Sequence, residues 1–141
     1  MMEADFRSLI VSASAITALV PASDIRLNFI PQGASAKAVA IYRVSGVPGY
    51  VMDGPDGLEE SRIQVDVRCS DPKNAPGSGY SAAFAIAAQI KALLSGFKGT
   101  IGGTQFQMIG ILAERQSSED TDTAFYHRFS IDFQVWHRQT S

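Results

Sequence analysis

The chain has 141 residues with 45% hydrophobic and 18% charged content, which allows one sizeable core and excludes two ordinary domains, so we expect a single domain over residues 1–141. A formal net charge of -2 without a run of Lys and Arg argues against a general attraction to nucleic acid, and the low charged share indicates that other subunits cover part of the surface. No apolar run reaches the roughly 20 residues that cross a bilayer, and the acidic start is unlike a signal peptide, so we expect a soluble intracellular protein with no membrane partner.

The first part of the chain predicts a helical region followed by strands. Apolar residues recur at helical spacing from Glu3 to Val20, as one helix or as two shorter pieces, and Pro21 ends the pattern. Alternation then predicts strands at Ile25–Ile30 and Val39–Val47. Residues 48–60 are crowded with Gly, Pro and acids, and this composition predicts a long loop.

The second part predicts a strand, a helix and two more strands. Strict alternation over Arg62–Ser70 gives one apolar and one wet face, and Cys69 lies on the apolar face, which favours a small core residue over a reactive thiol. An apolar stripe from Ala83 to Phe97 predicts a helix. Strands are predicted at Thr104–Arg115 and from Phe125 to His137.

The predicted element order is α-β-β-β-α-β-β. Short links favour antiparallel neighbours, and two helices are enough to cover one face of such a sheet. We therefore expect an α+β fold with a mainly antiparallel sheet of about five strands and two helices packed on one face.

No residue pattern predicts catalysis, a cofactor or a bound metal. Ser, His and Asp are present, but no Gly-x-Ser-x-Gly elbow positions a nucleophile. His127 and His137 share a strand face, yet about 33 Å of strand separates them, so they cannot bind one ion. Asp53 and Asp56 lack the spacing of a calcium loop. We therefore expect a protein that is not an enzyme and has no catalytic residue, cofactor or metal.

The predicted loop at residues 48–60 is the strongest candidate for a functional site. A long loop without nucleophile, ligand set or phosphate-binding pattern is typical of a protein interface. Its acids form a local negative patch that repels phosphate, so this segment is not expected to grip DNA.

Several blocks of sequence together resemble the tail completion or tail-terminator (head-tail joining) proteins of long-tailed phages and gene transfer agents. These blocks are Tyr42-Arg-Val-Ser-Gly-Val-Pro-Gly-Tyr-Val-Met-Asp-Gly-Pro-Asp-Gly-Leu, Arg62-Ile-Gln-Val-Asp, Leu93-Leu-Ser-Gly-Phe-Lys-Gly and Phe129-Ser-Ile-Asp-Phe-Gln-Val-Trp-His. The resemblance spans almost the whole chain, although the stretch Asp71–Gly79 is longer than the family pattern.

The resemblance implies an α+β subunit that forms a ring, expected to be a hexamer, in the tail of a virion or virus-like particle assembled in the host cytoplasm. The ring would cap the tail tube, stop its polymerisation and bind the head connector. Its partners would be other copies of itself, the major tail tube protein and the head connector or adaptor protein, with DNA only as passing cargo in the channel.

Under this resemblance, residues 48–60 make an axial contact. We expect Tyr50, Met52 and Leu58 to be apolar anchors. The acids are expected to set the register of the contact or to line the channel: Asp53, Asp56, Glu59 and Glu60. Arg43 and Arg62 flank the segment and are expected to pair with those acids within or between subunits.

Two alternatives stay open at this point. A small α+β ligand-binding module or enzyme would show a deep pocket with convergent polar groups. A head-side adaptor of the same particle would share the size and composition of the chain.

Overall fold

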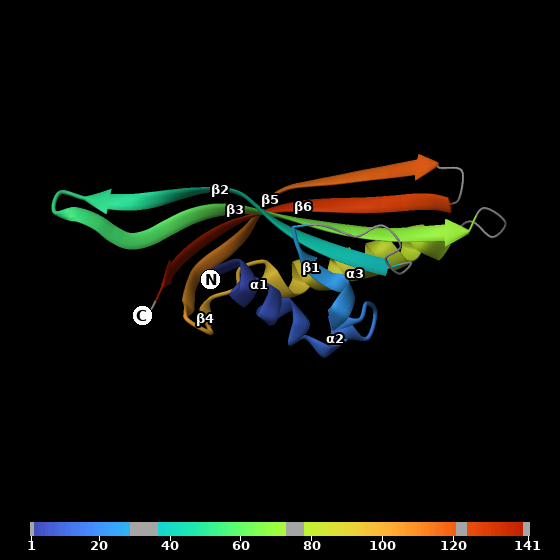
Figure 1. Cartoon of the computed structure of the whole chain (residues 1–141), viewed down its shortest axis with the longest axis horizontal. Coiled ribbons are helices and arrows are strands. Elements are labelled where there is room, and N and C mark those ends of the chain that lie inside the picture. The colour runs from blue at the N-terminus through green and yellow to red at the C-terminus, as the bar shows by residue number, and fades with distance from the viewer. Residues whose placement is uncertain (1, 29–36, 73–77, 121–123, 140–141) are drawn as a thin grey trace.

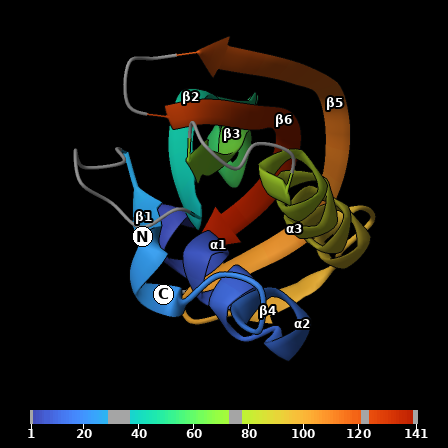
Figure 2. The same ribbon diagram turned by 90° about the vertical axis from the view of Figure 1, so that its right-hand side faces the viewer.

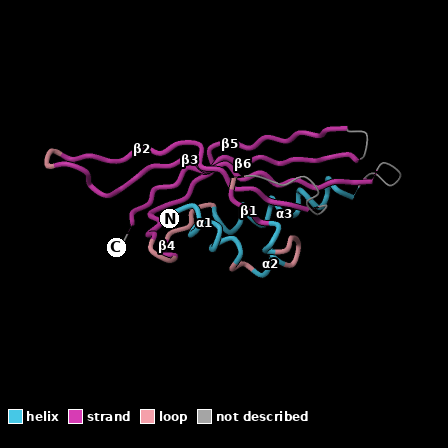
Figure 3. Tube along the Cα trace, in the orientation of Figure 1, coloured by secondary structure: helices cyan, strands magenta, loops and turns pink. Residues whose placement is uncertain are grey.

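The computed structural model describes residues 2–28, 37–72, 78–120 and 124–139 (Figure 1). Its elements are α1 (Met2–Val11), α2 (Ser14–Thr17), the 3-10 helix η1 (Ala22–Asp24), β1 (Ile25–Leu27), β2 (Lys37–Val51), β3 (Gly54–Pro72), α3 (Ser78–Leu94), β4 (Gly99–Ile101), β5 (Thr104–Asp120) and β6 (Ala124–Gln139). The strands form one six-stranded sheet in the order β1-β2-β3-β6-β5-β4. The helices lie against one face of this sheet, as the view coloured by secondary structure shows (Figure 3).

A large sheet with few helices agrees in outline with the predicted α+β class, but the sheet itself differs from the prediction. It has six strands rather than about five, because the short β4 pairs with the start of β5. It is also mixed, because β1 runs parallel to β2 while the other pairings are antiparallel. β1 ends at Leu27, since Asn28 adopts a left-handed φ of 75°. The last two residues of that predicted strand lie outside the described residues.

The core lies between the helices and the apolar face of the sheet. The region predicted as one helix or two consists of two, and α1 buries Phe6 completely. The Phe6 ring packs edge-on against Phe106 and Phe133, with centroid distances of 6.4 Å and 6.1 Å. The sheet curls around α1 with α3 alongside (Figure 2). Alternation along β3 and β6 therefore separates a helix-covered face from a helix-free face.

Residues 47–60 form a hairpin that projects from the rest of the molecule (Figure 1), and we call this segment the arm. The loop prediction is wrong, because β2 and β3 stay paired as far as Val51 and Gly54. Bulge-type register shifts absorb residues that do not fit a regular ladder. Pro48 and Pro55 are tolerated because β2 and β3 have a neighbour on one side only at these positions.

Candidate functional site

The arm exposes apolar side chains at one end of the molecule. Tyr50 is 68% exposed, Val51 57% and Met52 fully exposed, and Val47 nearer the body is 62% exposed. Leu58 is half-buried. Contiguous exposed apolar side chains are typical of a surface that binds another protein. The structure therefore brings Tyr50 and Met52 together at the tip, with Leu58 nearer the root.

The acids of the arm do not form the single negative patch that the sequence suggested. Strand pairing places Glu59 and Glu60 on opposite faces, because successive side chains of a strand point to opposite sides. Asp53 is exposed in the turn. Asp56 is half-buried, and its Oδ1 accepts a hydrogen bond from the Leu58 N–H at 2.9 Å. Only Asp53 therefore offers a free carboxylate at the tip.

An ion-pair cluster fixes the root of the arm on the helix-covered face. The Arg43 guanidinium pairs with Glu59 and lies 3.5 Å from Glu3 Oε1 of α1. The predicted pairing of Arg43 with an acid of this segment is confirmed. Gly46 makes room for the pair, because a Cβ at this position would collide with both side chains. The cluster joins β2, β3 and α1 where the arm leaves the body.

His137 lies beside this cluster and is only 4% exposed. Its Nε2 is 2.8 Å from Ser61 Oγ and 3.8 Å from Glu59 Oε2, while Nδ1 has no hydrogen-bond partner in the described part of the chain. Burial lowers the pKa of His137, and Glu59 opposes that effect. The neutral imidazole is therefore favoured at the root of the arm.

Within the subunit, Arg62 pairs with Asp132 rather than with the acids of the arm, so the predicted pairing within one subunit is wrong for this residue. It points to the helix-free face, where its Nη2 donates to Asp132 Oδ2 at 2.6 Å. Arg115 donates to the same carboxylate from β5, with distances of 2.8 Å and 3.2 Å. The hydrogen bond from Arg115 has the largest effect on the pKa of Asp132 and lowers it; burial opposes this, and Arg62 adds to the lowering.

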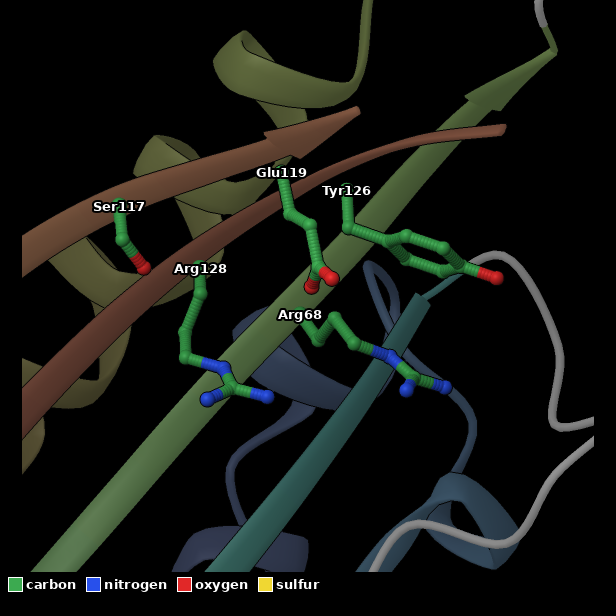
Figure 4. Close-up of a pocket in the computed structure, with 5 residues that line it drawn as sticks. All are labelled: Arg68, Ser117, Glu119, Tyr126 and Arg128. Carbon is green, nitrogen blue, oxygen red and sulfur yellow. The ribbon is translucent and has the colours of Figure 1, made fainter. Parts of the chain in front are cut away.

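A second charged group lies further along the helix-free face. A hollow of about 290 Å³ is lined by Arg68, Ser117, Glu119, Tyr126 and Arg128, whose side chains Figure 4 shows. The Arg68 guanidinium lies over the Tyr126 ring, 5.1 Å from its centroid. Sequence reasoning placed Arg68 on a wet strand face but did not single out this group. The polar alternation of β3 and β6 predicts that these residues share one face of the sheet. It does not predict which of them lie opposite one another on neighbouring strands.

In the described part of the chain, no group of at least three His, Cys, Asp or Glu side chains is placed to hold a metal ion. His127 instead contacts Ser118 Oγ at 3.0 Å and Asp71 Oδ2 at 3.3 Å. Cys69 is buried, and burial raises the pKa of its thiol to about 11, which keeps it protonated at neutral pH.

None of the helices in the described residues combines the length and the apolar character that crossing a membrane requires.

A projecting arm with an exposed apolar tip, on a subunit with a charged helix-free face, is typical of proteins that assemble with other proteins. The model of the family described as tail completion protein gp17 matches residues 5–138, so the chain belongs to that family. The family resemblance read from the sequence is thereby confirmed, and the chain is a structural protein of a phage-type tail.

Solved structures share the fold. One is a chain in the virion of a native gene transfer agent particle, with a TM-score of 0.72 and 14% sequence identity over 97% of this chain and 94% of that one. A second solved structure aligns with a TM-score of 0.52 and 18% identity over 96% of each chain. No curated protein matches the sequence.

Proposed function

We propose that this protein caps the finished tail tube as a ring of identical subunits, ends tube polymerisation and presents the surface to which the head connector binds. The observation that carries the proposal is the arm, whose exposed apolar tip is projected by a chain of the tail completion family. The family resemblance sets the expected ring number at six.

The arm is suited to a contact between preformed surfaces. Tyr50 and Met52 at its tip are exposed in the single subunit and would become buried against a partner, with Leu58 supporting the contact nearer the root. Arg43 and Glu59 tie the root of the arm to the body, which reduces the ordering entropy lost on binding.

Termination follows from a difference between the two axial faces of the ring. One face must be complementary to the last ring of the tube, and the other must differ from that ring so that no further tube subunit can add. The second face is then available to the head connector. DNA passes through the channel as cargo, and the net charge of -2 favours weak contact with its phosphates.

A shortened arm tests this role. Pro48 and Glu59 are direct strand partners, so replacing residues 49–58 by Asn-Gly leaves a two-residue hairpin and keeps the ion pair of Arg43 with Glu59. We expect the shortened protein to keep its thermal unfolding midpoint within a few degrees and to lose head-to-tail joining, counted by electron microscopy. Normal joining by this variant would reject the assigned role of the arm.

A matched control uses exposed apolar side chains of the body. Tyr50→Ala with Met52→Ala is compared with Met108→Ala with Leu112→Ala, whose side chains are 43% and 47% exposed on β5. Only the first pair is expected to impair joining. Tail lengths in particles lacking the protein separate a terminator from a head-side adaptor, because only loss of a terminator gives overlong tubes.

A further inference from the structure

The helix-free face carries two pairs of arginines, and they differ in one respect. Arg62 on β3 and Arg115 on β5 both donate to the Asp132 carboxylate, which lies on β6 between them. The carboxylate side chain is only 2% exposed, whereas the two arginine side chains are 45% and 52% exposed. One buried carboxylate therefore balances the repulsion between these two positive charges.

Arg68 and Arg128 are direct cross-strand partners on the same face. Like charges placed opposite one another destabilise a sheet unless something balances them. Neither guanidinium forms an ion pair with an acid of the described residues. The neighbouring Asp66 Oδ1 instead accepts hydrogen bonds from Ser130 Oγ at 2.6 Å and from Gln64 Nε2 at 2.9 Å. Compared with the first pair, this one has no acid within ion-pair distance, although Glu119 lines the same hollow.

The surroundings favour a single side-chain carboxylate over a nucleic acid. Figure 4 shows the carboxylate of Glu119 pointing into the hollow between the two arginine side chains. With Asp66 nearby, this acid repels a densely charged phosphate backbone more than it repels one carboxylate. The Tyr126 ring beneath Arg68 offers an apolar contact beside the charge. The hollow therefore fits an acid flanked by apolar residues.

The arm tip presents such an acid. Asp53 is exposed and follows the fully exposed Met52. The tip cannot reach the hollow of its own chain, because β3 runs from Gly54 at the tip to Arg68 in the hollow over about 46 Å of strand. In Figure 1 the tip lies at the left end of the molecule, and β3 ends at the right. If the Asp53 carboxylate enters this hollow, it therefore comes from a second copy of the chain.

We propose that the hollow of one subunit receives the arm tip of the next, with the Asp53 carboxylate between Arg68 and Arg128 and the Met52 side chain against the Tyr126 ring. This inference rests on the proposed ring of identical subunits. Contact between unlike ends of two copies is heterologous, and its repetition closes into a ring when the angle between subunits permits.

A cysteine pair tests the contact directly. Val51→Cys with Ser117→Cys leaves Asp53 and Arg128 in place and, in the full chain assembled on tail tubes, is expected to give disulfide-linked multiples of the 15.1 kDa subunit after mild oxidation. The native Cys69 does not interfere because it is buried, and the two new thiols are too far apart to join within one chain. The control pair, Val51→Cys with Gln107→Cys on β5, is expected to give no ladder.

Charge changes test the chemistry of the same contact. Arg128→Glu is expected to weaken self-association at least tenfold by analytical ultracentrifugation, and adding Asp53→Arg to it restores association. Glu119→Gln is expected to strengthen association, because it removes a charge that repels the incoming acid.

The outcomes separate this inference from the proposed function. Rings that form on tubes without the expected cross-link and without sensitivity to Arg128→Glu would overturn the inference and leave the proposed function in place. If Arg128→Glu weakened tube binding but not self-association, the hollow would be a binding site for the tube protein. This result would also overturn the inference. A protein that never assembles on tubes would overturn both.

Discussion

β2 and β3 run through both the body and the arm, and their side chains meet opposite conditions in the two regions. In the body, Ile41 and Val65 are paired strand residues with 1% and no exposure. In the arm, Val47 and Tyr50 of β2 are more than 60% exposed. The body is stabilised by its own core, whereas the exposed apolar side chains of the arm lie outside that core. The core of the subunit therefore does not account for the apolar residues of the arm, which is the region that we propose binds a partner.

The largest test of this contrast compares a core residue with tip residues. Phe6→Ala removes a fully buried ring that contacts Phe106 and Phe133, and we expect it to lower the free energy of unfolding by about 3–5 kcal/mol. Tyr50→Ala and Met52→Ala are expected to change it by less than about 0.5 kcal/mol each. Urea denaturation measures both. A destabilisation of similar size at the tip would remove the distinction between the two regions.

An intermediate effect is expected at the charged face of the body. Asp132→Asn breaks the contacts with Arg62 and Arg115 and is expected to cost about 1–3 kcal/mol of unfolding free energy at neutral pH. Because the folded pKa of Asp132 is lowered, its contribution is present above the unfolded pKa of about 3.9 and is lost as the pH falls through the folded value. The difference between wild type and variant should therefore shrink in acid. A difference that stays constant down to pH 2 would contradict this assignment.

The smallest effect concerns the root of the arm. Burial lowers the pKa of His137, so the unfolded chain binds the proton more tightly than the folded chain. Stability is therefore complete above the ordinary pKa of about 6.5 and decreases as the pH falls below it, until the folded pKa is reached. We expect His137→Gln to flatten this dependence between pH 7 and pH 5, measured as the unfolding midpoint in urea.

Glu59→Gln sharpens the same test. Glu59 raises the pKa of His137, so its removal should lower that pKa further and steepen the loss of stability in acid. An unchanged slope in both variants would exclude His137 as the titrating group.

Regular alternation made the body predictable from the sequence. The apolar face of Arg62–Ser70 and the stripe of α3 depend on neighbours in sequence, and both are found where the pattern places them. The arm escaped prediction because Gly and Pro usually interrupt strands, and only the edge position of Pro48 and Pro55 makes them acceptable there.

The partners of the charged side chains were beyond the same reasoning. Arg43 and Glu59 lie on neighbouring strands of one hairpin, and this pairing was expected from their closeness in sequence. Arg62 and Asp132 are 70 positions apart, and they meet only because β3 pairs with β6 in one particular register. A list of charges along the chain does not contain that register.

The single tryptophan has a practical consequence because of where it lies. Trp136 is half-buried and lines a small depression at the root of the arm, next to Val47 and Leu58. Indole emission moves to shorter wavelengths when water is excluded from the ring. A partner that covers this depression should therefore shift the emission of Trp136 to shorter wavelengths. Binding could then be followed in real time by the intrinsic fluorescence of the unlabelled protein.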